Sequence, residues 1–125
     1  QASGIRPPGP EWARNDNFIA TVAYDDGSVC SLTYTALGDK GFPKERMDVF
    51  ADGKVLSMDD YKSLTVCGGK HKPWTATAAQ KGQFEELQAL AESLRGGRPW
   101  PIPLDQLLSA SRIAFDVEAQ LTQQD

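Results

Sequence analysis

The stretch that decides the fold is Asn17-FIATVAYDDGSVCSLTY-Thr35. Two runs rich in β-branched and aromatic residues, 18–24 and 29–35, flank the dipeptide Asp26-Gly27. An Asp-Gly between two such runs is a strong signal for an antiparallel β-hairpin. If Asp26 and Gly27 form a two-residue loop, Tyr24 pairs with Val29 across the hairpin.

This pairing predicts how the side chains divide between the two faces of the hairpin. One face then carries Tyr24, Val29, Val22 and Ser31, and the other carries Ala23, Cys30, Thr21, Leu32, Ile19 and Tyr34. Neither face is plainly polar, and no charge lies outside the turn, whereas a solvated antiparallel sheet is apolar on one side only. We therefore expect a sheet that its own helices cover on one face and something else covers on the other.

Length and composition limit the class of protein. The chain has 125 residues, 13 basic and 17 acidic, for a net charge of −4, which suits one domain. It has no basic block and no apolar run of the ~20 residues that a membrane span needs, so neither nucleic acid nor a membrane is an expected partner. Cys30 and Cys67 have no metal-type spacing and are expected to be buried free thiols of a cytoplasmic protein.

More strands follow the hairpin. Residues 45–51 and 54–58 flank a second turn, Asp52-Gly53, and residues 61–67 form a last strand. A two-residue loop at Asp52-Gly53 places apolar side chains on one face, namely Met47, Val49, Leu56 and Met58, while Leu64 and Val66 of the last strand face one way.

Two helices are expected after the strands. Thr77 and Gln80 fit a capping box that begins the first helix, and Gly96-Gly97 ends it. Pro103 can occupy the first position of a second helix that runs to Leu121. Strands followed by helices predict an α+β fold: a mostly antiparallel sheet of about five strands, with two helices packed on one face and the other face free for oligomer contact.

The expected organisation is a linker or N-terminal arm (1–16), one α+β domain (17–121) and a polar tail (122–125). The arm contains Arg6-Pro7-Pro8-Gly9-Pro10, which has no periodicity. Because a piece cut from a larger sheet would have unpaired N–H and C=O groups at its edge, we expect this arm or another chain to cap that edge.

Few residues indicate chemistry. No phosphate-binding glycine pattern joins a strand to a helix, and no metal ligand set or nucleophile–base motif is present, so no catalytic, cofactor or metal residue is predicted. The acidic pairs Asp25-Asp26 and Asp59-Asp60 are typical of turns. Four residues are candidates for substrate binding: Lys40, Lys44, Lys81 and His71. The first two lie in a glycine-rich loop, Lys81 opposes the dipole of the first predicted helix, and His71 is the single histidine.

Several segments, in their order and spacing, resemble the C-terminal domain of the glucose–fructose oxidoreductase / inositol dehydrogenase (Gfo/Idh/MocA) family. They are residues 18–29, residues 32–46, Lys81-Gly82 before Phe84-Glu85-Glu86-Leu87, Arg95-Gly96-Gly97 and Pro101-Ile102-Pro103-Leu104. The resemblance covers about residues 16–121. It is to the branch in which this domain is often fused behind a zinc-type alcohol dehydrogenase module.

The resemblance implies a part of a dehydrogenase. In that family an N-terminal Rossmann domain binds NAD or NADP and carries a catalytic lysine in a Glu-Lys-Pro motif, and the exposed face of the C-terminal sheet contacts another subunit. This chain lacks the Rossmann domain, the Glu-Lys-Pro motif and the family's Asp-x-x-x-His motif, since Cys67 stands four residues before His71. By resemblance it is a fragment or a separately made piece, inactive alone, with no cofactor of its own.

Three functions are therefore open. The first is a substrate-side and oligomerisation domain of an NAD(P)-dependent oxidoreductase, which forms a homo-oligomer through the helix-free face of its sheet. The second is a stand-alone module that binds a partner protein through that face. The third, a small hydrolase, would need a nucleophile and a base in one pocket, and the chain offers one histidine.

Overall fold

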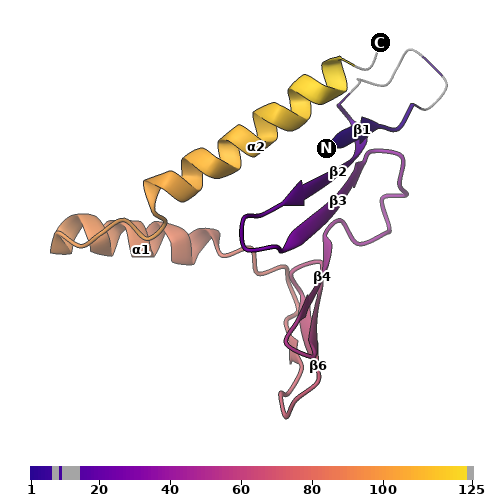
Figure 1. Ribbon diagram of the computed structural model, residues 1–125. Helices are drawn as coiled ribbons and strands as arrows, with labels where there is room; N and C mark the ends of the chain where they lie inside the picture. Colours follow the sequence, from indigo (N-terminus) through magenta and orange to yellow (C-terminus); the bar gives the residue numbers. More distant parts are fainter. Residues whose placement is uncertain (7–8, 10–14, 124–125) are drawn as a thin grey trace. The chain divides into compact units, whose positions relative to one another are not determined.

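The computed structural model describes residues 1–6, 9 and 15–123. The chain folds as two compact units, residues 1–38 with 96–125, and residues 39–95. Each unit has its own antiparallel sheet, and the described residues also form two helices (Figure 1). The predicted α+β class is confirmed, but the strands form two sheets, of three and four strands, instead of one sheet of about five.

The first unit is a three-stranded sheet covered by one helix. Its strands are β1 (Ala2–Gly4), β2 (Asn17–Ala23) and β3 (Val29–Thr35), with β2 in the middle. Helix α2 (Leu104–Thr122) packs against β1 and β2 (Figure 1). The small core under the helix consists of Ala2, Ala20 and Leu121, with Phe18 and Val117 beside it.

The first hairpin differs from the prediction by one residue in register. Ala23 pairs with Val29 and Val22 with Cys30, and the Tyr24 N–H donates to the Ser28 carbonyl oxygen at 2.9 Å. The loop therefore has three residues, Asp25-Asp26-Gly27, with Gly27 at φ +87°, as in a type I turn followed by a glycine bulge. The Asp26 carboxylate holds this loop by accepting the Ser28 N–H at 2.9 Å and its hydroxyl at 2.6 Å.

A shift of one residue exchanges the faces of one strand relative to the other. In the observed register α2 lies on a face that carries apolar and aromatic side chains. They are Phe18, Ala20, Val22, Tyr24, Cys30, Leu32 and Tyr34. The opposite, helix-free face carries Asn17, Thr21, Ser31, Thr33 and Thr35 besides Ile19, Ala23 and Val29. The expectation of two apolar faces was wrong, because it assumed a two-residue loop.

The N-terminal arm caps one edge of this sheet, as expected. Strand β1 pairs with β2, and the Ile5 N–H donates to the Asn17 carbonyl oxygen at 2.8 Å. The Ala2 N–H also donates to the side chain of Gln120 in α2 at 2.8 Å. The opposite edge is β3, whose seven residues are all exposed, so the arm caps one side of the sheet and capping of the other side by another chain stays a prediction.

The second unit is a meander of β4 (Arg46–Ala51), β5 (Lys54–Asp59), β6 (Ser63–Cys67) and β7 (Trp74–Thr75), paired in that order. Here the predicted register is confirmed, since Ala51 pairs with Lys54 and Val49 with Leu56. Asp52 (φ +50°) and Gly53 (φ +70°) form the two-residue loop. Positive φ at both central residues is the geometry of a type I′ turn, which matches the twist of a hairpin.

Helix α1 (Gln83–Gly96) begins later than predicted and packs differently. Thr77 does not cap it, because the backbone before the helix is held in other hydrogen bonds: the Ala76 N–H donates to the Lys62 carbonyl oxygen and the Gln80 N–H to that of Tyr61. The predicted glycine stop is confirmed by Gly97 at φ +60°. Within residues 39–95, α1 packs against no strand, so the expected packing of two helices on one sheet face was wrong.

Candidate functional site

Charged and aromatic side chains gather beside the end of β5, and we call this group the Lys81 cluster: Glu45, Asp60, Tyr61, Lys62 and Lys81. The Lys81 ammonium donates to Glu45 Oε1 at 2.6 Å and lies 5.3 Å from the centre of the Tyr61 ring. Lys62 Nζ donates to Asp60 Oδ2 at 2.5 Å. One predicted binding residue, Lys81, therefore lies in an organised polar site.

The backbone that forms this cluster is strained. Asp60 and Tyr61 have consecutive positive φ angles, +48° and +52°, a conformation that is rare for a bulky side chain such as tyrosine. Two hydrogen bonds hold it: the Asp60 N–H donates to the Glu45 carbonyl oxygen at 2.7 Å, and the Tyr61 carbonyl oxygen accepts from the Gln80 N–H at 2.8 Å. Glu45 Oε2 is buried and makes no hydrogen bond among the described residues.

The electrostatics of the cluster exclude some chemistry for Lys81. The hydrogen bond to Glu45 raises the pKa of the Lys81 amine, and nearby negative charge adds to the effect. The hydrogen bond from Lys62 lowers the pKa of the Asp60 carboxyl. An amine with a raised pKa is protonated at neutral pH and is neither a general base nor a nucleophile. Lys81 can instead donate hydrogen bonds to an anionic or hydroxyl-bearing ligand.

The other three predicted binding residues do not join this cluster through their side chains. Lys40 is exposed in a turn, where the Phe42 N–H donates to the Asp39 carbonyl oxygen. Lys44 is exposed, and its backbone N–H interacts with the Asp60 carboxylate. His71 is exposed in the loop before β7 and has no hydrogen bond or ion pair within the described part of the chain. The sequence did not indicate Glu45 or Tyr61, because their contacts with Lys81 are long-range.

Neither cysteine is in a disulfide, as predicted, but Cys30 and Cys67 are exposed and not buried. Cys30 belongs to the edge strand β3, and the register places its side chain on the part of the apolar face that α2 leaves open. Among residues 1–6, 9 and 15–123, no group of His, Cys, Asp and Glu side chains could hold a metal ion. Nor does any helix of this part have the length and apolarity to cross a membrane.

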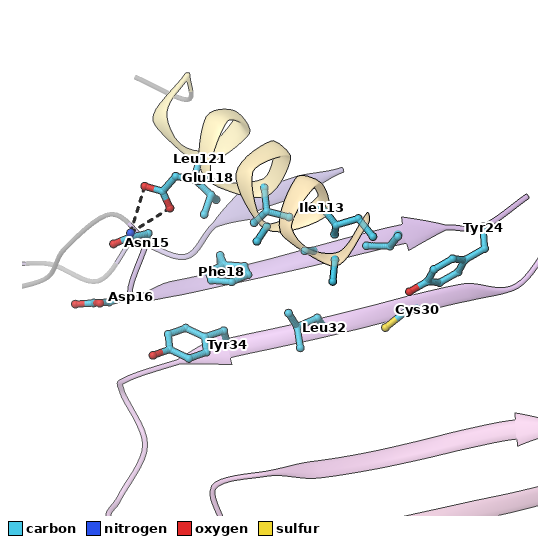
Figure 2. Close-up of a pocket in the computed structure, with 15 residues that line it drawn as sticks. Asn15, Asp16, Phe18, Tyr24, Cys30, Leu32, Tyr34, Ile113, Glu118 and Leu121 are labelled. Carbon is cyan, nitrogen blue, oxygen red and sulfur yellow. Dashed lines mark hydrogen bonds between the residues drawn. The ribbon is translucent and has the colours of Figure 1, made fainter. Parts of the chain in front are cut away.

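An apolar groove lies between α2 and the first sheet (Figure 2). It has a volume of about 540 Å³. Aromatic and aliphatic side chains of β2 and β3 form its floor, and Ile113, Val117 and Leu121 of α2 form its wall. At one end, the Asn15 amide donates to both carboxylate oxygens of Glu118, at 3.2 and 3.1 Å. Since α2 contacts β1 and β2, the β3 side of the floor stays exposed.

The second sheet has an apolar face that no element of its own unit covers. Cross-strand pairs place Met47, Val49, Leu56, Met58, Leu64, Val66 and Trp74 together on it. Met47 is 53% and Trp74 45% exposed, and no residue of 39–95 is buried. We call this surface the meander face. Leu56, Met58, Leu64 and Val66 are half-buried. An apolar surface that is partly exposed in this way is a candidate interaction site.

Comparison of the chain with protein-family models, with curated proteins and with solved structures gave no match.

Proposed function

We propose that this chain is the substrate-side and oligomerisation domain of an NAD(P)-dependent oxidoreductase of the Gfo/Idh/MocA type, and that it is not catalytic alone. The resemblance across residues 16–121 supports the family. In this proposal a Rossmann domain of the parent enzyme supplies NAD or NADP, and this chain contributes no cofactor ligand. The proposed parent enzyme is cytoplasmic.

The observation that carries the assembly role is the meander face. Its one charged residue in the four strands is Lys54, which pairs with Ala51 at the turn end of the sheet, so two copies can bring the rest of this face together without burying unpaired charge. The helix-free face of the first sheet is the poorer candidate, because it is rich in Ser, Thr and Asn. We therefore place the proposed oligomer contact of two copies on the meander face.

A substrate-side role draws on the Lys81 cluster. Its protonated Lys81 has donor capacity beyond the single hydrogen bond to Glu45, and Lys40 and Lys44 add positive charge in the same unit. These groups suit a hydroxylated or anionic substrate bound beside the cofactor of another domain. His71 is exposed in a loop and belongs to neither the Lys81 cluster nor the meander face, so no observation favours the hydrolase alternative.

The second candidate, a stand-alone interaction module, is favoured by the open apolar groove beside α2. The two candidates differ in what completes the protein. An oxidoreductase domain should assemble with its own copies and, with a Rossmann domain of the same protein, form a working enzyme. An interaction module should not associate through its meander face and should bind a different protein in the groove.

The first test is the mass of the purified chain in solution, by light scattering over a concentration series. Val49→Lys places a charge on the meander face, where Val49 is 39% exposed. We expect this change to lower the mass because the charge would be buried in the contact. Phe50→Lys is the matched control, since Phe50 is 76% exposed on the opposite face of the same strand. Equal masses for wild type and Val49→Lys would contradict the assembly role.

A further inference from the structure

Strand β3 is an open edge with backbone groups ready to pair. The Tyr24–Ser28 and Ala36–Asp16 hydrogen bonds show that even-numbered residues face β2 with their N–H and C=O groups. The groups of Val29, Ser31, Thr33 and Thr35 therefore point away from β2, because the two directions alternate along a strand. No strand of the described chain lies beyond β3 in this sheet.

This edge lacks the features by which proteins protect exposed edges, such as charged residues, proline, bulges or very short strands. The other three sheet edges have them. Strand β1 has three residues, β7 has two, and β4 carries Arg46 and Asp48. Strand β3 has seven residues, Val-Cys-Ser-Leu-Thr-Tyr-Thr, with no charge, proline or glycine. Of the four edges, β3 is the one suited to pair with another strand.

We propose that β3 pairs antiparallel with β3 of a second copy, around a two-fold axis at Leu32, to form a six-stranded sheet. The two strands form hydrogen bonds only in a register that pairs residues whose N–H and C=O groups point away from β2 in both copies. Centring on Leu32 is the one such register that uses the whole strand. Val29 then pairs with position 35 of the second copy, and Ser31 with position 33.

The side chains suit this pairing. On the groove face, Leu32 meets its own counterpart, and Cys30 meets position 34 of the second copy, so the exposed halves of the two apolar grooves become one surface. On the opposite face, Ser31 and Thr33 form a hydroxyl pair of a kind that stabilises antiparallel sheets. The acidic turns Asp25-Asp26 lie at opposite ends of the paired strands and do not repel each other. The contact is self-complementary, as a two-fold interface requires.

Cysteine cross-linking tests the register. In a Cys30→Ser, Cys67→Ser background, Leu32→Cys should form a covalent dimer under mild oxidation, because opposed residues of a non-hydrogen-bonded pair have Cα atoms about 4.5 Å apart, within disulfide range. Tyr34→Cys in the same background is the matched control on the same face and should form no covalent dimer, because position 34 faces a serine at position 30 of the second copy. With the native Cys30 restored, Tyr34→Cys should cross-link, since position 34 faces position 30.

A proline substitution tests the backbone pairing. Thr33→Pro removes an outward N–H and leaves the hydrogen bonds between β2 and β3 intact, because proline is tolerated on the free side of an edge strand. We expect Thr33→Pro to reduce the yield of the Leu32→Cys cross-link at least tenfold. Thr33→Val, which keeps the N–H, should leave that yield unchanged. Unchanged cross-linking in Thr33→Pro would overturn the proposal, as would equal cross-linking of Leu32→Cys and Tyr34→Cys in the cysteine-free background.

This inference does not depend on the proposed function, and the two fail separately. Val49→Lys acts on the meander face and should leave the Leu32→Cys cross-link unchanged. If Leu32→Cys does not cross-link while Val49→Lys lowers the solution mass as expected, β3 pairing alone is refuted. A persistent cross-link with no effect of Val49→Lys on mass would refute the meander-face contact alone.

Discussion

The two units each contain a hairpin with an Asp-Gly turn, but the two turns are built differently. Asp52-Gly53 is a two-residue loop with both residues at positive φ, whereas Asp25-Asp26-Gly27 is a three-residue loop with only its glycine at positive φ. The difference lies in Ser28, whose N–H and hydroxyl both bond to Asp26. The residue after the second turn is Lys54, and no such bond forms. A neighbour of the dipeptide thus decides the loop length and, through it, which side chains share a face.

The largest expected effect concerns the packing behind the second turn. A Cβ at Gly68 would lie 2.4 Å from the Gly53 carbonyl oxygen and 3.1 Å from Lys54 Cα, and Gly68 itself has φ +85°. Because both obstacles are backbone atoms, we expect Gly68→Ala to destabilise the protein by more than about 2 kcal/mol, the sum of a clash and the ~1–2 kcal/mol cost of a left-handed residue. Urea unfolding measures this loss.

Gly27→Ala is the matched control in the first turn. Gly27 has nearly the same φ, +87°, but no atom lies within 4 Å of the position of an added Cβ. Its cost should therefore be the backbone term alone, about 1–2 kcal/mol. Equal losses for the two variants would show that the Gly68–Gly53 contact does not support the second turn.

A smaller effect is expected at the open ends of the hairpins. The first is anchored by Asn17, which is fully buried and accepts hydrogen bonds from the Thr35 hydroxyl at 2.8 Å and the Ala36 N–H at 2.9 Å. Asn17→Ala should cost about 1–3 kcal/mol, because it removes two hydrogen bonds of a buried side chain, each with a net value of about 0.5–1.5 kcal/mol. The second is anchored by the exposed Arg46–Asp59 ion pair at 3.7 Å, and Arg46→Ala should cost no more than ~1 kcal/mol. Thermal unfolding compares the two, and a larger loss for Arg46→Ala would reverse this ranking.

The smallest effect is the pH dependence of the turns. The hydrogen bonds from Ser28 lower the pKa of the Asp26 carboxyl below 3.8, so their stabilisation is present above the unfolded pKa and is lost as the pH falls through the folded pKa. In the second unit the hydrogen bond from Lys62 lowers the pKa of the Asp60 carboxyl, so its stabilisation is likewise lost as the pH falls through the folded pKa. The pKa of Lys81 is raised above 10.5, so its contribution is full below that value and is lost as the pH rises through the folded pKa.

Amide chemical shifts followed by NMR from pH 2 to 6 test the acid side of this prediction. The Ser28 amide should titrate with a midpoint below 3.8, and Asp26→Asn should remove that titration while the Asp60 response remains. A Ser28 midpoint at or above the ordinary aspartate value would contradict the role of Asp26 in the first turn.

Local patterns were sufficient to predict several parts of the fold. They located both hairpins, the register at Asp52-Gly53 and the glycine stop of α1, because these depend on residues near one another in the chain. They failed at Thr77, where hydrogen bonds from Ala76 and Gln80 to the backbone of residues 61–62 prevent an earlier helix start. They also failed at Tyr24–Ser28, where a side-chain bond changes the loop. Lys81 was predicted as a site residue, but its partners Glu45 and Tyr61 depend on long-range contacts that no local pattern shows.

The first unit is assembled from the two ends of the described chain, with β1 to β3 before the second unit and α2 after it. During synthesis, residues 39–95 can therefore fold before α2, which covers the apolar face of β2 and β3, has been made. Until α2 emerges from the ribosome, Phe18, Ala20 and Val22 have no cover within their own unit, and β3 offers a free edge beside them. The order of translation thus exposes this half-sheet to chaperones and to premature pairing between neighbouring ribosomes until α2 is made.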